Sequence, residues 1–317
     1  MRNIHPVDED RTILDYFVIA LKGFCMGVAD IIPGISGGTI AFILEIYEDL
    51  IKAIKSFDGN FLRLLLKGKI REAFGSVAWR FLGSVIAGIG CAIVLLAKII
   101  SWLLREHPVF INAFFFGLIL ATVPIIAGAM KKWDVKKITA LFVSAAGTFF
   151  FVQLTPVSTP ESWWFIFASG AIAICAMILP GISGAFILLL LGKYQFILTA
   201  IHSRDIGTIL IFMAGMAVGI LSFVRMLEWL FRKYHDMTIA VLAGFVIGSL
   251  NKIWPWKRIL ETITTSSGKM IPVREINIFP TSFDGQVIAA LLLVLAGSAV
   301  AFLLHAIPQR HEKIKGK

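Results

Sequence analysis

The chain has 317 residues, of which 58% are hydrophobic and 16% are charged, with a mean hydropathy of +0.85 and a formal net charge of +10. Soluble domains are about 45–50% apolar and about 25% charged, so the composition excludes an ordinary soluble protein and predicts an integral membrane protein. In a membrane protein, basic residues indicate which side of the membrane a segment lies on. No segment is typical of a nucleic-acid-binding module, so we expect no nucleic acid partner. The cysteines and histidines have no metal-ligand spacing, so we expect no metal site.

Ten apolar segments follow one another along the chain and predict an all-α, polytopic fold. They span residues 12–32, 35–54, 77–104, 109–130, 136–155, 163–179, 182–200, 207–231, 238–254 and 285–308. Lys and Arg gather in the links 52–80, 131–137 and 232–237 and after residue 308, whereas the link 155–162 has neither. The positive-inside rule therefore predicts a multi-pass protein with both termini in the cytoplasm.

The link 255–284 fits this rule less well. It is predicted to lie outside, yet it carries Lys257, Arg258, Lys269 and Arg274. Long links follow the rule poorly, so the predicted topology stands.

Two of the apolar runs are interrupted by the same motif. The letters PGISG from Pro33 to Gly37 recur from Pro180 to Gly184, and Tyr47 recurs as Tyr194 at the same offset. Proline and glycine disfavour a continuous helix, so both prolines are predicted helix breaks.

The repeated motif predicts two halves, about 1–140 and 141–317, within a single membrane domain. Each half is expected to hold one re-entrant hairpin, about 12–54 and 163–200, and about three spanning helices. An odd number of crossings places the second half upside down relative to the first. Inverted repeats with interrupted helices indicate a transporter whose site lies near the bilayer midplane.

A new helix is predicted after each break, and a helix start favours an anion, phosphate above all. The candidate phosphate-binding residues are the small and hydroxyl residues of both motifs and two arginines as counter-charges: Gly34, Ser36, Gly37, Gly38, Thr39, Gly181, Ser183, Gly184, Arg80 and Arg225. For one motif alone a packing hinge is the better interpretation, but two copies in inverted halves favour a binding site.

Ionisable residues inside apolar segments are functional candidates, because they are costly in lipid. Asp30 and Glu45 are the candidates for proton coupling, since the second copy has Met177 and Gly192 at these places. The alternative is a local ion pair with Lys22.

Other spacings favour structural roles. Arg225 and Glu228 lie three apart, as a pair on one helix face would. Small residues four apart, at Gly83 and Ala87 and again at Gly215 and Gly219, predict close helix packing.

The doubled motif, each copy after an apolar half-helix and before Tyr47 or Tyr194, resembles the PopT family of bacterial polyprenyl-phosphate transporters over nearly the whole chain. This resemblance implies a non-enzymatic transporter of the bacterial cytoplasmic membrane that uses no cofactor. Its partners would be a polyprenyl-phosphate lipid and the surrounding membrane lipids, with protons or another ion for coupling. It would move undecaprenyl phosphate from the outer to the inner leaflet, which recycles the lipid carrier of peptidoglycan synthesis.

Two alternatives remain. The motif is similar to the Pro-Gly-x-Ser-Arg-Ser stretch of undecaprenyl-pyrophosphate phosphatases, in which the arginine clamps the pyrophosphate. Gly37 and Gly184 stand where that arginine should be, so the residues suit phosphate binding better than cleavage. A channel or exchanger for small anions would also use broken helices at the midplane.

Overall fold

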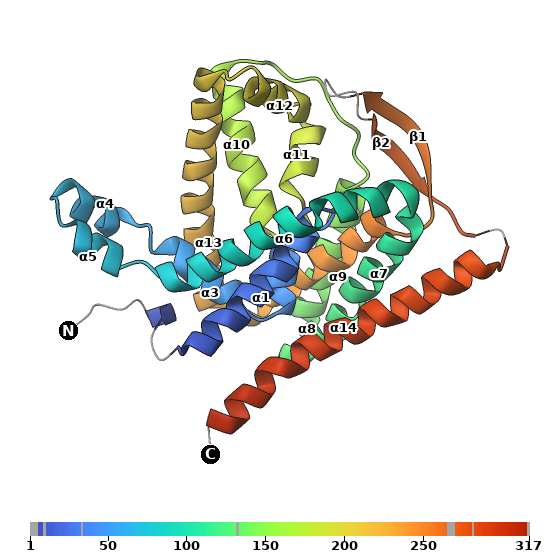
Figure 1. The fold of residues 1–317 in the computed structure, drawn as a ribbon, viewed down its shortest axis with the longest axis horizontal. Helices are drawn as coiled ribbons and strands as arrows, with labels where there is room; N and C mark the ends of the chain where they lie inside the picture. The colour runs from blue at the N-terminus through green and yellow to red at the C-terminus, as the bar shows by residue number, and fades with distance from the viewer. Residues whose placement is uncertain are drawn as a thin grey trace.

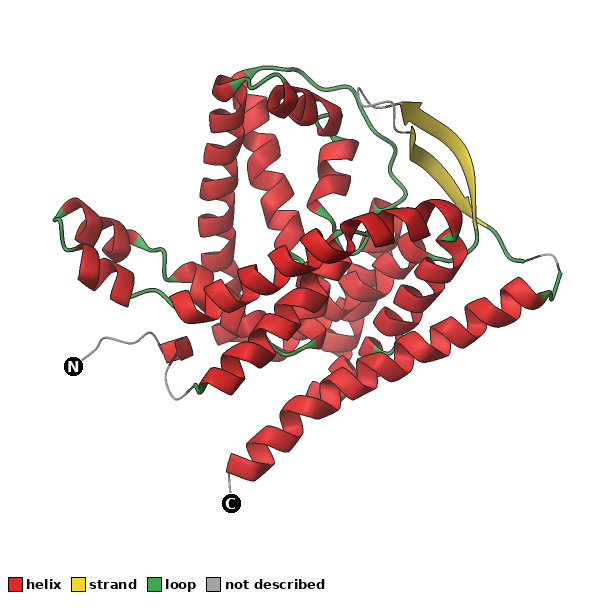
Figure 2. Cartoon of the chain, in the orientation of Figure 1, coloured by secondary structure: helices red, strands yellow, loops and turns green. Residues whose placement is uncertain are grey.

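The computed structural model describes residues 6–8, 11–32, 34–130, 133–264, 270–280 and 282–315. Within these residues the chain is mostly helical, with one two-stranded antiparallel sheet (Figures 1 and 2). The helices are α1 (Ile13–Asp30), α2 (Gly37–Ile43), α3 (Tyr47–Lys55), α4 (Gly59–Leu66), α5 (Ile70–Gly75), α6 (Trp79–Glu106), α7 (Pro108–Leu120), α8 (Thr122–Ala129), α9 (Val135–Phe151), α10 (Trp163–Ile178), α11 (Gly184–Leu190), α12 (Tyr194–His202), α13 (Ile206–Ser249) and α14 (Gly285–Lys315). Two short 3-10 helices, η1 (Pro6–Asp8) and η2 (Leu250–Ile253), and the strands β1 (Lys257–Thr264) and β2 (Met270–Asn277) complete the fold.

Among the described residues, four helical stretches are long and apolar enough to cross a membrane. They are Trp79–Glu106, Pro108–Ile126, Ile206–Ile253 and Gly285–His305. The bent pair α11 and α12, which meet at 103°, would add a fifth. The molecule is therefore a multi-pass, mostly helical membrane protein, as the composition predicted, with the β-hairpin as the departure from an all-α fold.

The segments 35–54 and 182–200, each predicted as one run, are in fact two helices. Helices α2 and α3 are separated at Glu45, which has φ 58°, and helices α11 and α12 are separated at Gly192, which has φ 62°. A residue in the left-handed region cannot continue a right-handed helix. These two positions are also 147 residues apart, so the repeat extends to the backbone conformation.

The segments 207–231 and 238–254, predicted as separate helices, are the two parts of α13 that meet at a kink. Its helix is kinked at Tyr234 (φ −135°, ψ 47°), so the basic residues Arg232 and Lys233 are helical rather than in a loop. The predicted link has neither glycine nor proline, and the interruption is confined to the non-helical residue Tyr234. His107, between α6 and α7, has nearly the same conformation (φ −134°, ψ 48°).

Two links that were predicted without secondary structure contain some. Helices α4 and α5 lie within 52–80 and project from the body of the molecule in Figure 1. The link 255–284 contains the hairpin of β1 and β2, in which Ile259 is opposite Glu275. Its strands are rich in β-branched residues, a signal that a search for apolar runs overlooks.

Helix α1 packs on α6, and helix α10 packs on α13, through glycines that let the backbones meet. A Cβ on Gly88 would collide with the backbone of Ala20, and one on Gly215 would collide with that of Phe167. The packing role predicted for Gly215 is therefore confirmed. The one predicted for Gly83 was wrong, because a Cβ there meets open space and Gly88 makes the contact instead.

Candidate functional site

The first break, residues 31–36 between α1 and α2, turns on Gly34, whose φ of 93° favours glycine. Pro33, the predicted helix breaker, lies outside the described residues. Ser36 is the N-cap of α2, and its Oγ accepts a hydrogen bond from the N–H of Gly38 at 3.1 Å. This is the usual way in which a serine satisfies a free helix N–H group.

A carboxylate of the protein occupies the start of α2. The N–H of Gly37 donates to Oδ1 of Asp30 at 2.6 Å, and the N–H of Thr39 donates to the carbonyl oxygen of Ser36 at 2.9 Å. The first N–H groups of this helix therefore already have acceptors, and Asp30 supplies the negative charge that a helix start favours. A phosphate that bound here would have to displace Asp30.

The second break, residues 179–183 between α10 and α11, lacks such a carboxylate. Pro180 lies in its turn, and Gly181 has φ 85°, close to the value at Gly34. Ser183 is the N-cap before Gly184, but its side chain makes no capping hydrogen bond. Met177 stands where the first copy has Asp30, so the two helix starts are electrostatically different.

The two breaks meet. The Oγ of Ser36 donates to the carbonyl oxygen of Met177 at 2.9 Å, and the N–H of Gly181 donates to Oγ1 of Thr39 at 2.8 Å. A Cβ on Gly38 would lie 2.5 Å from the carbonyl oxygen of Ile178, so only glycine allows this approach. Each motif thus supplies hydrogen-bonding groups to the other, and we call this contact the break junction.

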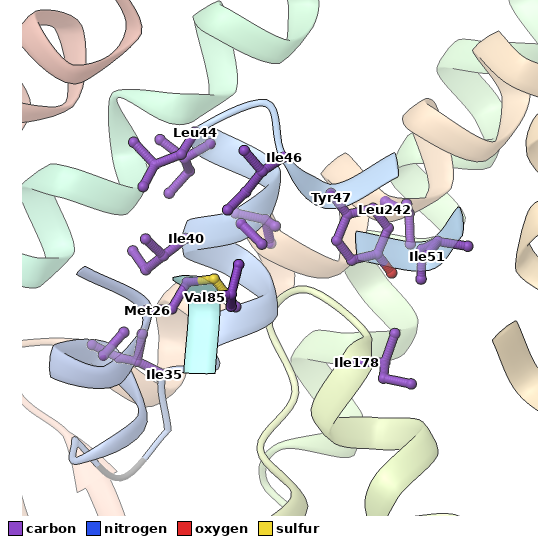
Figure 3. Packing of buried hydrophobic residues seen from close by; sticks show 14 of the residues in the cluster. Met26, Ile35, Ile40, Leu44, Ile46, Tyr47, Ile51, Val85, Ile178 and Leu242 are labelled. Carbon is purple, nitrogen blue, oxygen red and sulfur yellow. The ribbon is translucent and has the colours of Figure 1, made fainter. Parts of the chain in front are cut away.

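The break junction lies in apolar surroundings. Ser36 is 1% exposed and Thr39 is 0% exposed. Figure 3 shows the buried side chains nearby, which come from several helices: Met26, Ile40, Val85, Ile178 and Leu242. Hydrogen bonds are strong in such an environment, and an unpaired polar group is costly.

Comparisons with known proteins identify the family. The sequence profile of the family described as undecaprenyl phosphate translocase-like matches residues 26–271, which include both breaks. The chain belongs to this family. The resemblance that the doubled motif indicated is thereby confirmed.

Two named relatives agree with this assignment. The polyprenyl-phosphate transporter of Vibrio cholerae serotype O1 is 41% identical over 300 residues, which cover 92% of this chain and 96% of that protein. The polyprenyl-phosphate transporter of Staphylococcus aureus is 30% identical over 254 residues, which cover 74% and 85% of the two chains. No solved structure matches the chain.

The two arginines that we predicted as counter-charges in this translocase-like protein are both exposed. Arg80 is at the start of α6, close to Tyr16, and Arg225 is on α13. The predicted pair of Arg225 with Glu228 was wrong, because Glu228 forms its salt bridge with Lys55 at 3.0 Å.

Glu45, the second coupling candidate, lies beyond the C-terminal end of α2. Its carboxylate is 3.1 Å from Nδ1 of His305 on α14. Lys22 donates to the carbonyl oxygen of Leu44 at 2.8 Å, so it binds the backbone beside Glu45. This cation therefore helps to hold the left-handed turn.

Sequence reasoning missed a lysine at the break junction. The Cγ of Lys252 is 2.8 Å from the position that a Cβ on Gly34 would take, and its Nζ is 5.5 Å from the ring centre of Phe186 on α11. The only sequence signal for it was indirect, namely the unexplained basic residues of the adjoining link 255–284.

Thr39→Val is expected to weaken the break junction. Valine has nearly the same shape as threonine but cannot accept the N–H of Gly181, so a buried donor loses its partner. We expect the free energy of unfolding to fall by about 1–3 kcal/mol, measured by denaturant unfolding in detergent.

The matched control is Thr139→Val. This exposed threonine on α9 bonds only to the carbonyl oxygen of Val135 in its own helix. Its replacement should change the stability by less than about 0.5 kcal/mol. Equal effects of the two substitutions would contradict the structural role of the break junction.

Proposed function

We propose that this protein translocates polyprenyl phosphate across a membrane and that it acts as a transporter rather than as an enzyme. Membership of the undecaprenyl phosphate translocase-like family carries this proposal, and both named relatives are polyprenyl-phosphate transporters. The meeting of two interrupted helices in a buried, polar contact supports it, since transporters form substrate sites from such breaks.

We further propose that the lipid is undecaprenyl phosphate, that it moves from the outer to the inner leaflet of the bacterial cytoplasmic membrane, and that both termini are cytoplasmic. The basic links favour this orientation. Transport in this direction would return the carrier lipid to cell-envelope synthesis.

Alternating access between two inverted halves is the mechanism that we propose. The recurrence of left-handed residues at Gly34 and Gly181, and of the kink at His107 and Tyr234, supports two related halves. Helix α9 runs through residue 140, the predicted boundary. We place the boundary instead in the link 152–162, where the chain leaves α9.

The small residues of the two breaks remain our proposed phosphate-binding groups. At the first break, Asp30 holds the N–H of Gly37, so binding and release of phosphate would alternate with binding and release of Asp30. This exchange of phosphate and Asp30 would couple lipid transport to protonation. Uptake of a proton by Asp30 would release the N–H of Gly37 and free the start of α2 for phosphate. Glu45, paired with His305, is the second proposed coupling group.

Depletion of the protein from its bacterium tests the function. We expect undecaprenyl phosphate to accumulate in the outer leaflet, measured with a phosphate-directed probe that does not cross the membrane. Re-expression should reverse the accumulation. An unchanged amount at the surface, with other undecaprenyl phosphate transporters removed, would contradict the proposal.

A second measurement separates transport from hydrolysis. Purified protein mixed with undecaprenyl pyrophosphate should release no inorganic phosphate, because Gly37 and Gly184 provide no guanidinium to clamp a pyrophosphate. Release above that of a buffer control would favour a phosphatase.

A further inference from the structure

Three charged side chains form a cluster beside the break junction. The Nζ atoms of Lys252 and Lys257 lie 3.3 Å and 3.1 Å from the same oxygen, Oε2 of Glu275. The three side chains are 22%, 13% and 15% exposed, respectively. We call Lys252 and Lys257 the lysine pair, and Glu275 is the carboxylate that they share.

The hairpin brings this cluster together. Lys257 is on β1 and is opposite Asn277 on β2, so Glu275 is its diagonal neighbour two residues away. Lys252 comes from η2, directly after α13. Residues from η2 and from both strands of the hairpin thus converge on one carboxylate, which indicates a specific arrangement and not a chance surface pair.

Hydrogen bonds hold the hairpin against η2. The side-chain amide of Asn277 donates to the carbonyl oxygen of Asn251 at 2.9 Å, and Nε1 of Trp254 donates to the carbonyl oxygen of Ile278 at 2.9 Å. Both bonds join the base of the hairpin to the turn that carries Lys252. The lysine pair therefore has a fixed position relative to the breaks.

That position lies next to both breaks. The stem of Lys252 packs against Gly34 of the first break, and its ammonium group lies over the ring of Phe186, which follows the second break. Arg80 and Arg225 are exposed and have no such contact in the described structure. Lys252 is thus a cation that contacts Gly34 in the first copy of the motif and the ring of Phe186, two residues after the second copy.

The charges of the cluster do not balance. Two ammonium groups share one carboxylate, which leaves a surplus of one positive charge in a half-buried place. Partly buried charges without partners are unfavourable, so this arrangement favours a second anion. We propose that Lys252 and Lys257 bind the phosphate monoester of the transported lipid and that Glu275 holds the two lysines when the phosphate is absent. This inference rests on the proposed function.

The electrostatics of the hairpin agree with such a role. Burial alone would raise the pKa of Glu275, but the charges of Lys257 and Lys252 outweigh it and hold the pKa below its usual value. Glu275 is therefore an anion at neutral pH and a direct competitor of phosphate for the same ammonium groups.

The surplus basic residues of the link 255–284 also gain an explanation. Lys257 lies in a link predicted to be external, where the positive-inside rule disfavours lysine. A lysine that binds a lipid phosphate on that side of the membrane serves recognition rather than orientation.

Ligand binding to the purified full-length protein tests the site. The probes are farnesyl phosphate, farnesol and inorganic phosphate, followed by the fluorescence of the nearby Trp254 and Trp256. We expect Lys252→Gln and Lys257→Gln each to raise the Kd for farnesyl phosphate about tenfold or more, since each removes a charge-assisted contact. The affinity for farnesol should not change, and Lys252→Arg should bind nearly as the wild type does.

Glu275→Gln should act in the opposite direction and lower the Kd for farnesyl phosphate, because the competing anion is gone. A purely structural salt bridge predicts no such gain. This variant decides the matter even if a lysine variant fails to fold. Unchanged phosphate affinity in folded lysine variants, or weaker binding in Glu275→Gln, would overturn the inference.

A neighbouring cavity provides the matched control. It has a volume of about 430 Å³ and is lined by residues that include Tyr194, Glu261 and Arg274. Arg274 forms an exposed salt bridge with Glu261 at 3.1 Å on the same hairpin. Arg274→Gln should leave binding unchanged, and a loss of affinity in this variant alone would place the phosphate in the cavity and overturn the assignment to the lysine pair.

Two further outcomes separate the possible failures. Inorganic phosphate that binds as tightly as farnesyl phosphate would overturn the assignment to a lipid head group. If reconstituted wild-type protein transports the lipid and the lysine variants bind farnesyl phosphate with unchanged affinity, the lysine pair is rejected and the proposed function stands. Reconstituted wild-type protein that moves no polyprenyl phosphate would reject the proposed function itself.

Discussion

Gly181→Ala is expected to stop transport and to lower the free energy of unfolding by about 2–5 kcal/mol. Two penalties add at this position. The φ of 85° is unfavourable for a residue with a Cβ, by about 1–2 kcal/mol. The new Cβ would also lie 2.6 Å from the carbonyl oxygen of Phe245, and such overpacking costs about 1–3 kcal/mol.

Gly34→Ala is the informative comparison. Its φ of 93° imposes a similar strain, but the nearest atom to the new Cβ is Cγ of Lys252, a side-chain atom 2.8 Å away, and not a backbone carbonyl. We therefore expect about half the loss of stability. Gly83→Ala on α6 is the control, because its Cβ meets open space and alanine is the better helix former by about 0.5–1 kcal/mol.

Denaturant unfolding in detergent, followed by tryptophan fluorescence, measures all three variants. The expected order of stability is Gly83→Ala, then Gly34→Ala, then Gly181→Ala. A Gly181→Ala protein as stable as the Gly83→Ala protein would show that the second break does not need its left-handed turn.

Asp30→Ala is expected to have the second large effect. It leaves the N–H of Gly37 without its acceptor and removes the negative charge at the start of α2. A hydrogen bond to a charged group contributes about 1.5–3 kcal/mol, so we expect a loss of that size in the free energy of unfolding. Transport should stop, because the proposed exchange of anions at the first break has lost one of its partners.

Asp30→Asn separates the charge from the hydrogen bond. Asparagine keeps an acceptor for Gly37 but carries no charge and cannot take up a proton. We expect it to regain much of the stability that alanine loses, while transport into liposomes no longer responds to an imposed pH gradient. Glu72→Gln, at an exposed acid on α5, should leave both properties unchanged. A normal gradient response in Asp30→Asn would exclude Asp30 from coupling.

Local chemistry made part of this structure predictable. Proline and glycine disfavour a continuous helix, above all when they are adjacent, so the PGISG letters indicated both breaks. The mostly helical membrane fold followed from the composition and the apolar segments, but the β-hairpin did not. Gly88 was overlooked in favour of Gly83 because the spacing of small residues does not say which face of α6 meets α1.

Contacts between distant residues were beyond local reasoning. The bonds from Ser36 to Met177 and from Gly181 to Thr39 join residues 141 and 142 positions apart. Arg80 and Arg225 were chosen as cations because they lie in apolar segments, but a sequence position does not reveal where a long side chain points. Lys252 was missed for the same reason, since only the hairpin and η2 together place it at the break junction.

The break junction also affects whether water and protons can pass through the protein. Its hydroxyl and amide groups bind one another, Ser36 and Thr39 are almost fully buried, and the buried side chains around them are apolar. Such a contact offers no row of free polar groups along which water can line up, and protons travel along such rows. In this conformation the protein should therefore conduct no protons across the bilayer. The movement of lipid then need not dissipate the proton gradient across the membrane.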